Sequence, residues 1–307
     1  MTALRTVVTL FPLLFGLGAC ALARGQDTSA PVWREMIYKR VDGQSLHAFV
    51  FPAVAGSVTG AHPAIAFFHG GGWVFGRPQE FFGACERFAR KGFTTISFEY
   101  RLSMNADGTY PKPGVSPIES VKDARSAIRW MRANASALHL DPDRLVVAGQ
   151  SAGGQLALAT ALIDINESTD DLSVSPEPNA LLLYSSNLNT LEPWVDMLLG
   201  DRSASIFAIS PYHHIRKNMP PAIEFRGLED NQMLPYIVDM FKRKMDRFGN
   251  TFEVVSYPGR KHYLGEGNEK YANYFDEEIM ERTDAFLRQH GFMPRSDAEA
   301  TPMEQAL

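Results

Sequence analysis

A serine flanked by small residues, placed between an apolar segment and a helix-forming one, constrains the fold of this chain most strongly. Gly149-Gln150-Ser151-Ala152-Gly153 directly follows the apolar segment 145–148, and residues 155–162 favour a helix. A sharp strand-to-helix turn crowds the backbone, so small residues are needed around the serine, and the turn lifts the hydroxyl clear of the sheet. We therefore expect Ser151 to be a nucleophile, although a glycine-rich turn without chemistry has the same pattern.

Strand and helix patterns alternate along the rest of the chain. This alternation predicts the α/β class, in which helices cover both faces of a mostly parallel sheet. The strand patterns lie at 33–51 (two strands around a tight turn at Asp42-Gly43), 64–68, 93–98, 145–148, 180–184, 222–225 and 252–257. The helical patterns lie at 78–91, after the N-cap residue Ser116, and at 155–162, 235–248 and 271–290.

One catalytic domain spanning residues 31–292 accounts for these patterns. The chain has 307 residues, 45% of them hydrophobic, which suits one large domain with a filled core. Residues 186–220 fit the alternation poorly, so we expect a cap or an irregular loop there, and we expect 293–307 to be a mobile tail. The net charge of −5 gives no reason to expect nucleic acid or an anionic membrane surface as a partner.

The N-terminal segment has the features of a secretory signal. Arg5 precedes an apolar run at 6–17 that is shorter than the roughly 20 residues needed to span a bilayer. Cleavage after Ala23 would make a soluble exported protein, and cleavage before Cys20, in a lipobox-like Leu17-Gly18-Ala19-Cys20, would make a lipoprotein. A buried N-terminal helix is the alternative. The other cysteine is Cys85, so we expect no intramolecular disulfide in the exported protein.

Three consecutive glycines follow the apolar strand pattern at 64–68, in His69-Gly70-Gly71-Gly72-Trp73. Glycines let the backbone approach a substrate closely and direct N–H groups toward it. Such donors stabilise the negative charge that develops on a carbonyl oxygen under nucleophilic attack. A flexible turn is the alternative, and the glycine patterns of phosphate-binding loops are not present.

A serine hydroxyl needs a base, and the chain order expected of this fold is serine, then acid, then histidine. Four of the eight histidines lie beyond Ser151: His213, His214, His262 and His290. His290 ends the last helical pattern, and the adjacent pair at 213–214 precedes any strand that could present the acid. His262 lies in a glycine-flanked loop directly after the strand pattern at 252–257. We therefore predict that His262 is the base.

The acid should follow a strand between Ser151 and His262. The strand pattern at 222–225 is followed by two acidic residues, Glu229 and Asp230. Asp230 is the predicted acid, with the role of holding the imidazole tautomer and stabilising the imidazolium, and Glu229 is its rival. We expect no metal site, because the histidine pair at 213–214 lacks the spacing of a ligand set. No cofactor is expected.

Taken together, these motifs resemble the hormone-sensitive-lipase-like esterases of the α/β-hydrolase superfamily. Phe98-Glu99-Tyr100-Arg101-Leu102 adds to the resemblance, which is greatest to bacterial carbohydrate esterases that act on acetyl or feruloyl esters. It implies an α/β-hydrolase fold and an oxyanion hole formed by the N–H groups of Gly71, Gly72 and Ala152. Arg226 and Tyr263 depart from the residues common in that group, and neither departure removes a predicted catalytic residue.

The sequence thus predicts a serine carboxylesterase that acts through an acyl-enzyme intermediate on a small-molecule or carbohydrate ester. Trp73, Phe75 and Trp194 are candidates for lining its pocket, with plain core packing as the alternative. An amidase or arylformamidase would use the same catalytic residues. A peptidase of the prolyl-oligopeptidase type would need room for a propeller domain. A non-catalytic binding protein would normally lack one of the three residues.

Overall fold

The computed structural model describes residues 33–54, 60–265 and 276–293. Its strands are β1 (Arg34–Val41), β2 (Gln44–Phe51), β3 (His62–Phe68), β4 (Thr94–Phe98), β5 (Leu140–Gln150), β6 (Ala180–Tyr184), β7 (Ala222–Gly227) and β8 (Phe252–Tyr257). They form one sheet in the order β1-β2-β4-β3-β5-β6-β7-β8. β2 is antiparallel to both β1 and β4, and all pairs from β4–β3 to β7–β8 are parallel. This confirms the predicted fold class.

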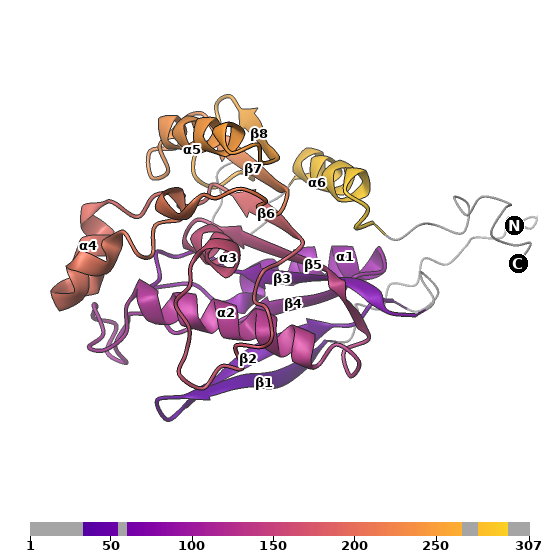
Figure 1. Cartoon of the computed structure of the whole chain (residues 1–307), viewed down its shortest axis with the longest axis horizontal. Coiled ribbons are helices and arrows are strands. Elements are labelled where there is room, and N and C mark those ends of the chain that lie inside the picture. Colours follow the sequence, from indigo (N-terminus) through magenta and orange to yellow (C-terminus); the bar gives the residue numbers. More distant parts are fainter. Residues whose placement is uncertain (1–32, 55–59, 266–275, 294–307) are drawn as a thin grey trace, which may run out of the picture. The chain divides into compact units, whose positions relative to one another are not determined.

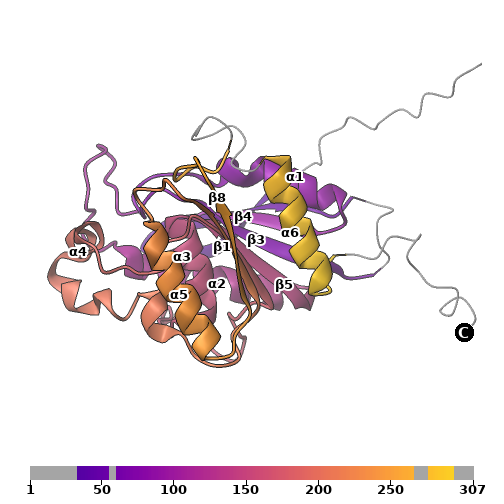
Figure 2. The same ribbon diagram turned by 90° about the horizontal axis from the view of Figure 1, so that it is seen from above.

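Helices cover both faces of the sheet (Figures 1 and 2). The helices are α1 (Phe82–Arg90), α2 (Pro117–Ala133), α3 (Ala152–Leu162), α4 (Pro193–Leu199), α5 (Pro235–Arg247) and α6 (Glu277–Gln289), with 3₁₀ turns η1 (Pro78–Phe81), η2 (Gly200–Ile206) and η3 (Pro211–His214). α2, α3 and α5 contribute to one apolar core, and α1 and α6 to the core on the opposite face. Because both faces are covered, central strands such as β6 are buried along their whole length.

The predicted element boundaries differ from the observed ones on both sides of Ser151. β5 begins at Leu140, which pairs with His62, and regular pairing resumes only at Leu145 with Ala64. The residues between them are an irregularity in the ladder, which is why the apolar pattern began later than the strand. α3 begins directly after Ser151, because the tight turn imposes helical geometry on glycines that favour no helix by themselves.

Residues 186–220, which fitted the alternating pattern poorly, contain α4, η2 and η3. This segment contacts the N-terminus of α2, where Ser116 caps the helix and the carboxylate of Glu119 accepts the Ser116 backbone N–H at 2.9 Å. Arg202 from η2 donates to the same carboxylate at 2.8 Å. The N-cap residue predicted at Ser116 thus belongs to a capping box with Glu119, and this box also holds a distant segment in place.

A buried ionic network joins β1 to α2, and we call it the Arg101–Asp123 network. The Asp123 carboxylate is fully buried and accepts from Lys39 Nζ at 2.7 Å, from the Arg101 guanidinium at 2.8 Å and from the Arg101 backbone N–H at 2.8 Å. Glu167 supplies a second carboxylate, 2.7 Å from Arg101 and 3.2 Å from Lys39. Each of these charges has an opposite charge in contact, which is the condition for burying it.

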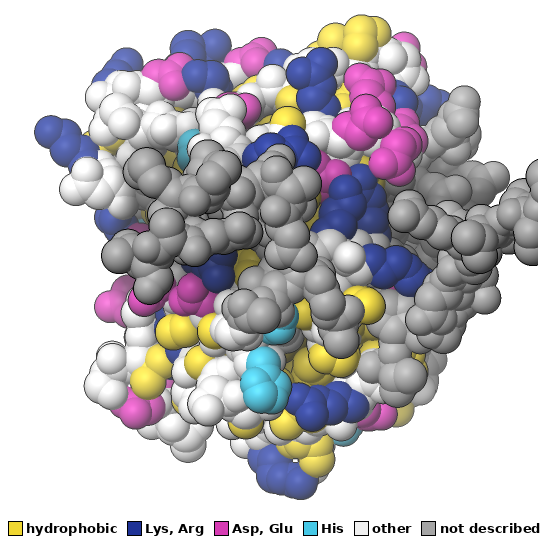
Figure 3. Space-filling model, turned by 90° about the vertical axis from the view of Figure 1, so that its right-hand side faces the viewer, with side chains coloured by type: hydrophobic (Ala, Val, Ile, Leu, Met, Phe, Trp, Pro, Cys, Tyr) yellow, Lys and Arg dark blue, Asp and Glu magenta, His cyan; other side chains and the backbone are white. Residues whose placement is uncertain are grey.

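In the part of the chain that the structure describes, no helix is long and apolar enough to cross a bilayer. On the face drawn in Figure 3, Lys and Arg side chains lie among Asp and Glu side chains. Cys85 is buried and forms no disulfide within the described ranges. The predicted signal segment with Cys20, and the predicted tail from residue 294 onward, lie outside the described residues.

Candidate active site

Ser151 occupies a strained turn between β5 and α3. Its backbone has φ 55° and ψ −120°, a conformation that residues other than glycine rarely adopt. A Cβ atom at Gly149 would lie 2.1 Å from the Gly153 carbonyl oxygen, and one at Gly153 would lie 2.0 Å from that of Phe68. The small residues on both sides of Ser151 are therefore required by the close approach of the turn to itself and to β3.

His262 and Asp230 meet at the carboxyl ends of β8 and β7. Nδ1 of His262 lies 2.9 Å from Oδ2 of Asp230, and both side chains are buried. The other carboxylate oxygen accepts the backbone N–H groups of Gln232 at 2.8 Å and Met233 at 2.9 Å. With the Nδ1 proton directed at Asp230, Nε2 is the proton acceptor of the neutral ring. Glu229, the rival acid, is exposed to solvent.

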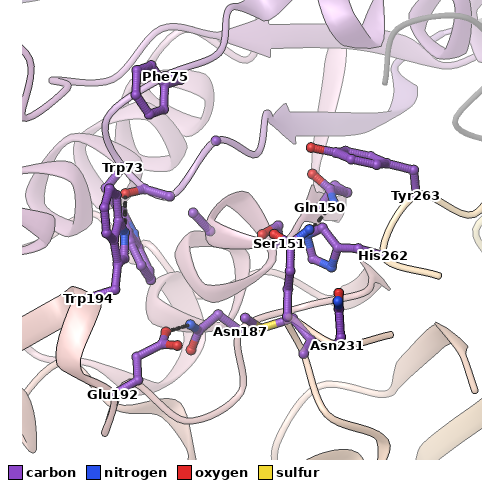
Figure 4. A pocket seen from close by; sticks show the side chains of 15 residues that line it. Trp73, Phe75, Gln150, Ser151, Asn187, Glu192, Trp194, Asn231, His262 and Tyr263 are labelled. Atoms are coloured by element: carbon purple, nitrogen blue, oxygen red, sulfur yellow. Dashed lines mark hydrogen bonds between the residues drawn. The ribbon is translucent and has the colours of Figure 1, made fainter. Parts of the chain in front are cut away.

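Ser151 and His262 line one pocket together with Gln150 (Figure 4). Nε2 of His262 lies 3.3 Å from the side-chain nitrogen of Gln150, which donates to it. Among the described residues, Oγ of Ser151 makes no hydrogen bond within 3.5 Å. Hydrogen bonds between catalytic groups are often long without substrate and shorten in the reacting complex. Gln150 was not predicted, although its position directly before the nucleophile, at the end of β5, was a usable signal.

The glycine loop that follows β3 borders the same pocket. Gly71 and Gly72 have φ values of 109° and 62°, and a Cβ atom at Gly71 would lie 2.3 Å from the Phe75 carbonyl oxygen. Within the described part of the chain, the N–H groups of Gly71 and Gly72 donate no backbone hydrogen bond. Ala152 is the first residue of α3, where N–H groups have no acceptor in the helix. All three N–H groups are therefore available to a ligand.

His69 holds this loop in shape. Its Nδ1 lies 2.8 Å from the Gly70 carbonyl oxygen, and its ring stacks on Tyr100 with centroids 4.3 Å apart. The Tyr100 hydroxyl donates to the His69 carbonyl oxygen at 2.9 Å. Burial lowers the pKa of His69 to about 4. The ring is therefore neutral near pH 7, and Nδ1 donates its proton to the loop backbone.

The pocket has a volume of about 440 Å³, and the three predicted aromatic residues line it differently. Trp73 is only 1% exposed and donates to the Gln155 side chain at 3.1 Å, so most of its ring packs in the core. Phe75 is 39% exposed at the rim. Trp194 donates from Nε1 to the Gly72 carbonyl oxygen at 3.1 Å. Tyr263, a departure from the residues common in the resembling group that could alter the pocket, also lines it, and the lining residues that the sequence did not predict are Gln150, Asn187, Glu192, Asn231, Gln232 and Met233.

Beneath the nucleophile turn lies a group of buried polar residues, which we call the Glu224 cluster: Ser185, Ser186, Asn187 and Glu224. Glu224 is fully buried on β7, and one carboxylate oxygen accepts the Ser186 N–H at 2.9 Å. Its other oxygen, the two hydroxyl oxygens and Oδ1 of Asn187 have no hydrogen-bond partner among the described residues. Burial raises the pKa of Glu224 to about 8. The cluster supports the turn directly, because the Asn187 N–H donates to the Ser151 carbonyl oxygen at 3.0 Å.

Among the described residues, no group of three or more His, Cys, Asp or Glu side chains is arranged to hold a metal ion. His213 and His214 make local contacts instead, with the hydroxyl of Ser210 at 2.9 Å and the carbonyl oxygen of Phe207 at 3.1 Å. The pair lies in η3, outside the residues that line the catalytic pocket.

Comparisons with known proteins agree with this geometry. The family model described as BD-FAE matches residues 54–180, and that of the prolyl oligopeptidase family matches residues 118–290, more than half of the chain. Solved structures of esterase 2 from Thermogutta terrifontis are similar over most of the chain. One is 31% identical, covers 87% of this chain and 98% of that chain, and superposes with a TM-score of 0.77.

Two curated relatives are also esterases by name. A probable isoprenylcysteine alpha-carbonyl methylesterase of Arabidopsis thaliana is 27% identical over 66% of this chain and 46% of its own length. Esterase LipI of Mycobacterium tuberculosis is 32% identical over 41% of this chain and 35% of its own length. The chain thus spans less than half the length of these two relatives. From the sheet topology, the nucleophile turn and these similarities together, we conclude that the chain belongs to the esterases of the α/β-hydrolase superfamily.

Proposed function

We propose that this protein is a serine carboxylesterase that hydrolyses short-acyl or aryl esters through an acyl-enzyme intermediate. The observation that carries the proposal is the contact of 2.9 Å between His262 and Asp230 in the pocket that Ser151 also lines. A histidine whose Nδ1 proton is held by a buried carboxylate presents Nε2 as a general base. A nucleophile at a tight strand-to-helix turn beside that base fits acyl transfer.

In the proposed reaction, Nε2 of His262 takes the hydroxyl proton of Ser151 while Oγ attacks the ester carbonyl carbon. The resulting imidazolium gives its proton to the leaving alcohol oxygen as the ester C–O bond breaks. Water then loses a proton to Nε2 and attacks the acyl-serine. The bond between the acyl carbon and Oγ breaks, Oγ takes the proton back from the imidazolium, and the carboxylic acid leaves. For the first step the Ser151 hydroxyl must take over the position at Nε2 that the Gln150 amide occupies.

We assign the oxyanion hole to the N–H groups of Gly71, Gly72 and Ala152. These groups border the pocket on the side of the glycine loop and of α3. Loss of one such donor typically costs roughly 3 to 4 kcal/mol of transition-state stabilisation. The close contacts around Gly71 and the hydrogen bonds of His69 keep the loop rigid, so the donors need no rearrangement during the reaction.

For the substrate, we propose an ester with a short or aromatic acyl group, such as an acetyl or feruloyl ester on a carbohydrate. Esterase 2 from Thermogutta terrifontis has been solved with propionate and with butyrate bound, which supports a short acyl group. The carbohydrate part rests on the motifs that resemble carbohydrate esterases and on the aromatic side chains beside the pocket.

The test is an activity profile of the purified protein over 4-nitrophenyl acetate, 4-nitrophenyl butyrate, methyl ferulate and acetylated xylo-oligosaccharides. We expect Ser151→Ala to lower kcat by about 10⁴-fold or more, because the nucleophile and base act as a unit. The wild-type protein should also be inactivated by paraoxon, with one diethylphosphoryl group on Ser151. A loss of only a few-fold in Ser151→Ala, or labelling elsewhere, would reject the assigned nucleophile.

The match to the prolyl oligopeptidase family makes peptide-bond hydrolysis a second candidate. The same catalytic residues would also serve an amidase or an arylformamidase. Turnover of a prolyl 4-nitroanilide or of an N-formyl arylamide with a higher kcat/KM than any ester would replace the carboxylesterase proposal. Lack of turnover of every substrate by folded protein would instead indicate a non-catalytic binding protein.

We also propose that the protein is exported, either as a soluble protein or as a lipoprotein anchored through Cys20. The support is the composition of residues 1–23, an apolar run after Arg5 that ends in two competing cleavage sites. Intact mass of the protein recovered from its host distinguishes the cases, because the two cleavage positions and the lipid give different masses. An intact N-terminus on the cytoplasmic protein would contradict export.

A further inference from the structure

A polar pair in the wall of the catalytic pocket has no part in the acyl transfer described above. Asn187 and Glu192 both line the pocket, and Nδ2 of Asn187 donates to the Glu192 carboxylate at 2.5 Å (Figure 4). Both residues come from the segment 186–220, outside the strands that carry the catalytic residues. A pocket fixes the orientation of its ligand through a small number of polar groups of this kind.

Glu192 is directed at the pocket and not at its own helix. It is the N-cap residue of α4, with extended φ and ψ of −143° and 151°, yet its side chain caps no N–H group of the helix. Burial raises the pKa of Glu192. The carboxylate is thus poorly solvated and is stabilised by any further donor that reaches it.

Asn187 holds the Glu192 carboxylate and also contacts the nucleophile turn. The residue is 2% exposed, and its Oδ1 has no partner among the described residues, although its Nδ2 is bound to Glu192. Its backbone N–H donates to the Ser151 carbonyl oxygen at 3.0 Å. A buried amide oxygen without a partner is costly. This oxygen is closed to a ligand in the pocket, so the part of Asn187 in the pocket wall is to hold the Glu192 carboxylate.

Aromatic side chains form the adjoining wall. Trp194 contacts Tyr110, and Tyr110 contacts Phe75, each pair with ring centroids 5.5 Å apart. Tyr110 and Phe75 are 42% and 39% exposed. Exposed aromatic faces at the rim of a pocket can bury the C–H surface of a ligand that passes over them. Polar acceptors on one wall and aromatic faces on the next suit a ligand that carries both hydroxyl groups and C–H surface.

We propose that Glu192 and Asn187 form a subsite for the hydroxyl groups of a sugar in the alcohol part of the ester. This inference rests on the esterase function proposed above. The Glu192 carboxylate, held by the Asn187 amide, accepts hydroxyl hydrogens, while Trp194 and its aromatic neighbours cover the ring. An acid beside aromatic rings can also bind a quaternary ammonium group. The amides of Asn231 and Gln232 on the same pocket favour the hydroxylated ligand, because they add directional donors and acceptors.

The test compares two acetates that differ only in the alcohol, an acetylated methyl xyloside and 4-nitrophenyl acetate. Glu192→Gln should lower the ratio of kcat/KM on the xyloside to kcat/KM on the nitrophenyl ester about tenfold, mainly through KM, because a charge-assisted hydrogen bond becomes a neutral one. Glu192→Ala, which removes the acceptor, should lower the ratio further. Asp196→Asn, one turn along α4 at an exposed position, is the matched control and should leave both activities unchanged.

An unchanged ratio in both Glu192 variants would overturn the subsite, and so would an equal loss on the two acetates. A selective loss on acetylthiocholine would overturn it in favour of a cation site. If the wild-type protein cleaves 4-nitrophenyl acetate but not the xyloside, the subsite fails while the esterase proposal stands. If wild-type protein cleaves neither acetate, the proposed function itself fails.

Discussion

The Arg101–Asp123 network and the Glu224 cluster are both buried, yet they satisfy their polar atoms to very different degrees. In the network, Asp123 has two cations and a backbone N–H in contact, and Glu167 shares the same cations. In the cluster, one oxygen of Glu224 has a partner, and four other buried polar atoms around it have none among the described residues.

This difference goes with position, because the cluster contacts the nucleophile turn and no residue of the network is among those lining the catalytic pocket. A buried polar atom without a partner costs roughly 1 to 3 kcal/mol, so such atoms are unusual away from functional sites. The network lies between β1 and α2, where every charged group has an opposite charge in contact. The cluster lies under Ser151, where the backbone must also hold a strained turn and line a pocket. We infer that the polar groups at the site lower the free energy of unfolding, whereas those of the network raise it. Three substitutions test this inference.

The largest effect is expected at the site, from Asp230→Asn. With its oxygen on the N–H groups of Gln232 and Met233, the amide donates its own N–H to Nδ1 of His262, which fixes the wrong tautomer and leaves the imidazolium without a counter-charge, so we expect kcat to fall about 10⁴-fold. The unfolding temperature should change little, because the amide oxygen can still accept the N–H groups of Gln232 and Met233. Kinetics and thermal unfolding on the same preparation provide the measurement, and a kcat within tenfold of wild type would contradict the assigned acid.

The reverse outcome is expected in the network, from Asp123→Asn. Removal of one partner leaves Lys39 and Arg101 buried without a full counter-charge, which typically costs about 3 to 5 kcal/mol of unfolding free energy. Denaturant unfolding measures this loss, while kcat per folded molecule should stay within about twofold. Asp246→Asn, which breaks an exposed pair with Lys242 in α5, is the control and should cost about 0.5 kcal/mol or less. A fall in kcat per folded molecule that accompanies the fall in unfolding free energy would contradict the comparison.

The smallest effect is expected from Glu224→Gln, and it depends on pH. The pKa of Glu224 is raised from 4.5 to about 8, so the folded protein keeps a proton that the unfolded chain loses between these values. Wild-type stability therefore falls as pH rises through this window, and the neutral amide removes that fall. We expect the variant to gain a few degrees in Tm over wild type between about pH 5 and about pH 9. A constant difference in Tm would show that Glu224 does not stay protonated.

The strands and helices could be predicted because burial on both sides of a parallel sheet leaves continuous apolar runs, such as 145–148 and 180–184. Boundaries were less predictable where tertiary contacts override local preference. The pairing of Leu140 with His62 extends β5 beyond its apolar run, and the turn at Ser151 begins α3 on residues with weak helix propensity.

The two halves of the pocket were not equally predictable. Ser151, Asp230 and His262 follow strands in a fixed chain order, so local patterns placed them, and the structure brings the last two into contact. Asn187 and Glu192 belong to a segment without a motif, whose path depends on contacts such as that between Arg202 and Glu119. Their position at the pocket follows from tertiary packing alone.

The order of the strands bears on how the protein responds to heat. Ser151 follows β5 in the middle of the sheet, whereas His262 follows β8, the outermost strand, which pairs only with β7 in the described sheet. Peripheral elements open at a lower free energy than central ones. Warming can therefore displace His262 while Ser151 is still rigidly held. The temperature at which activity is lost is then set by the edge of the sheet and not by its centre.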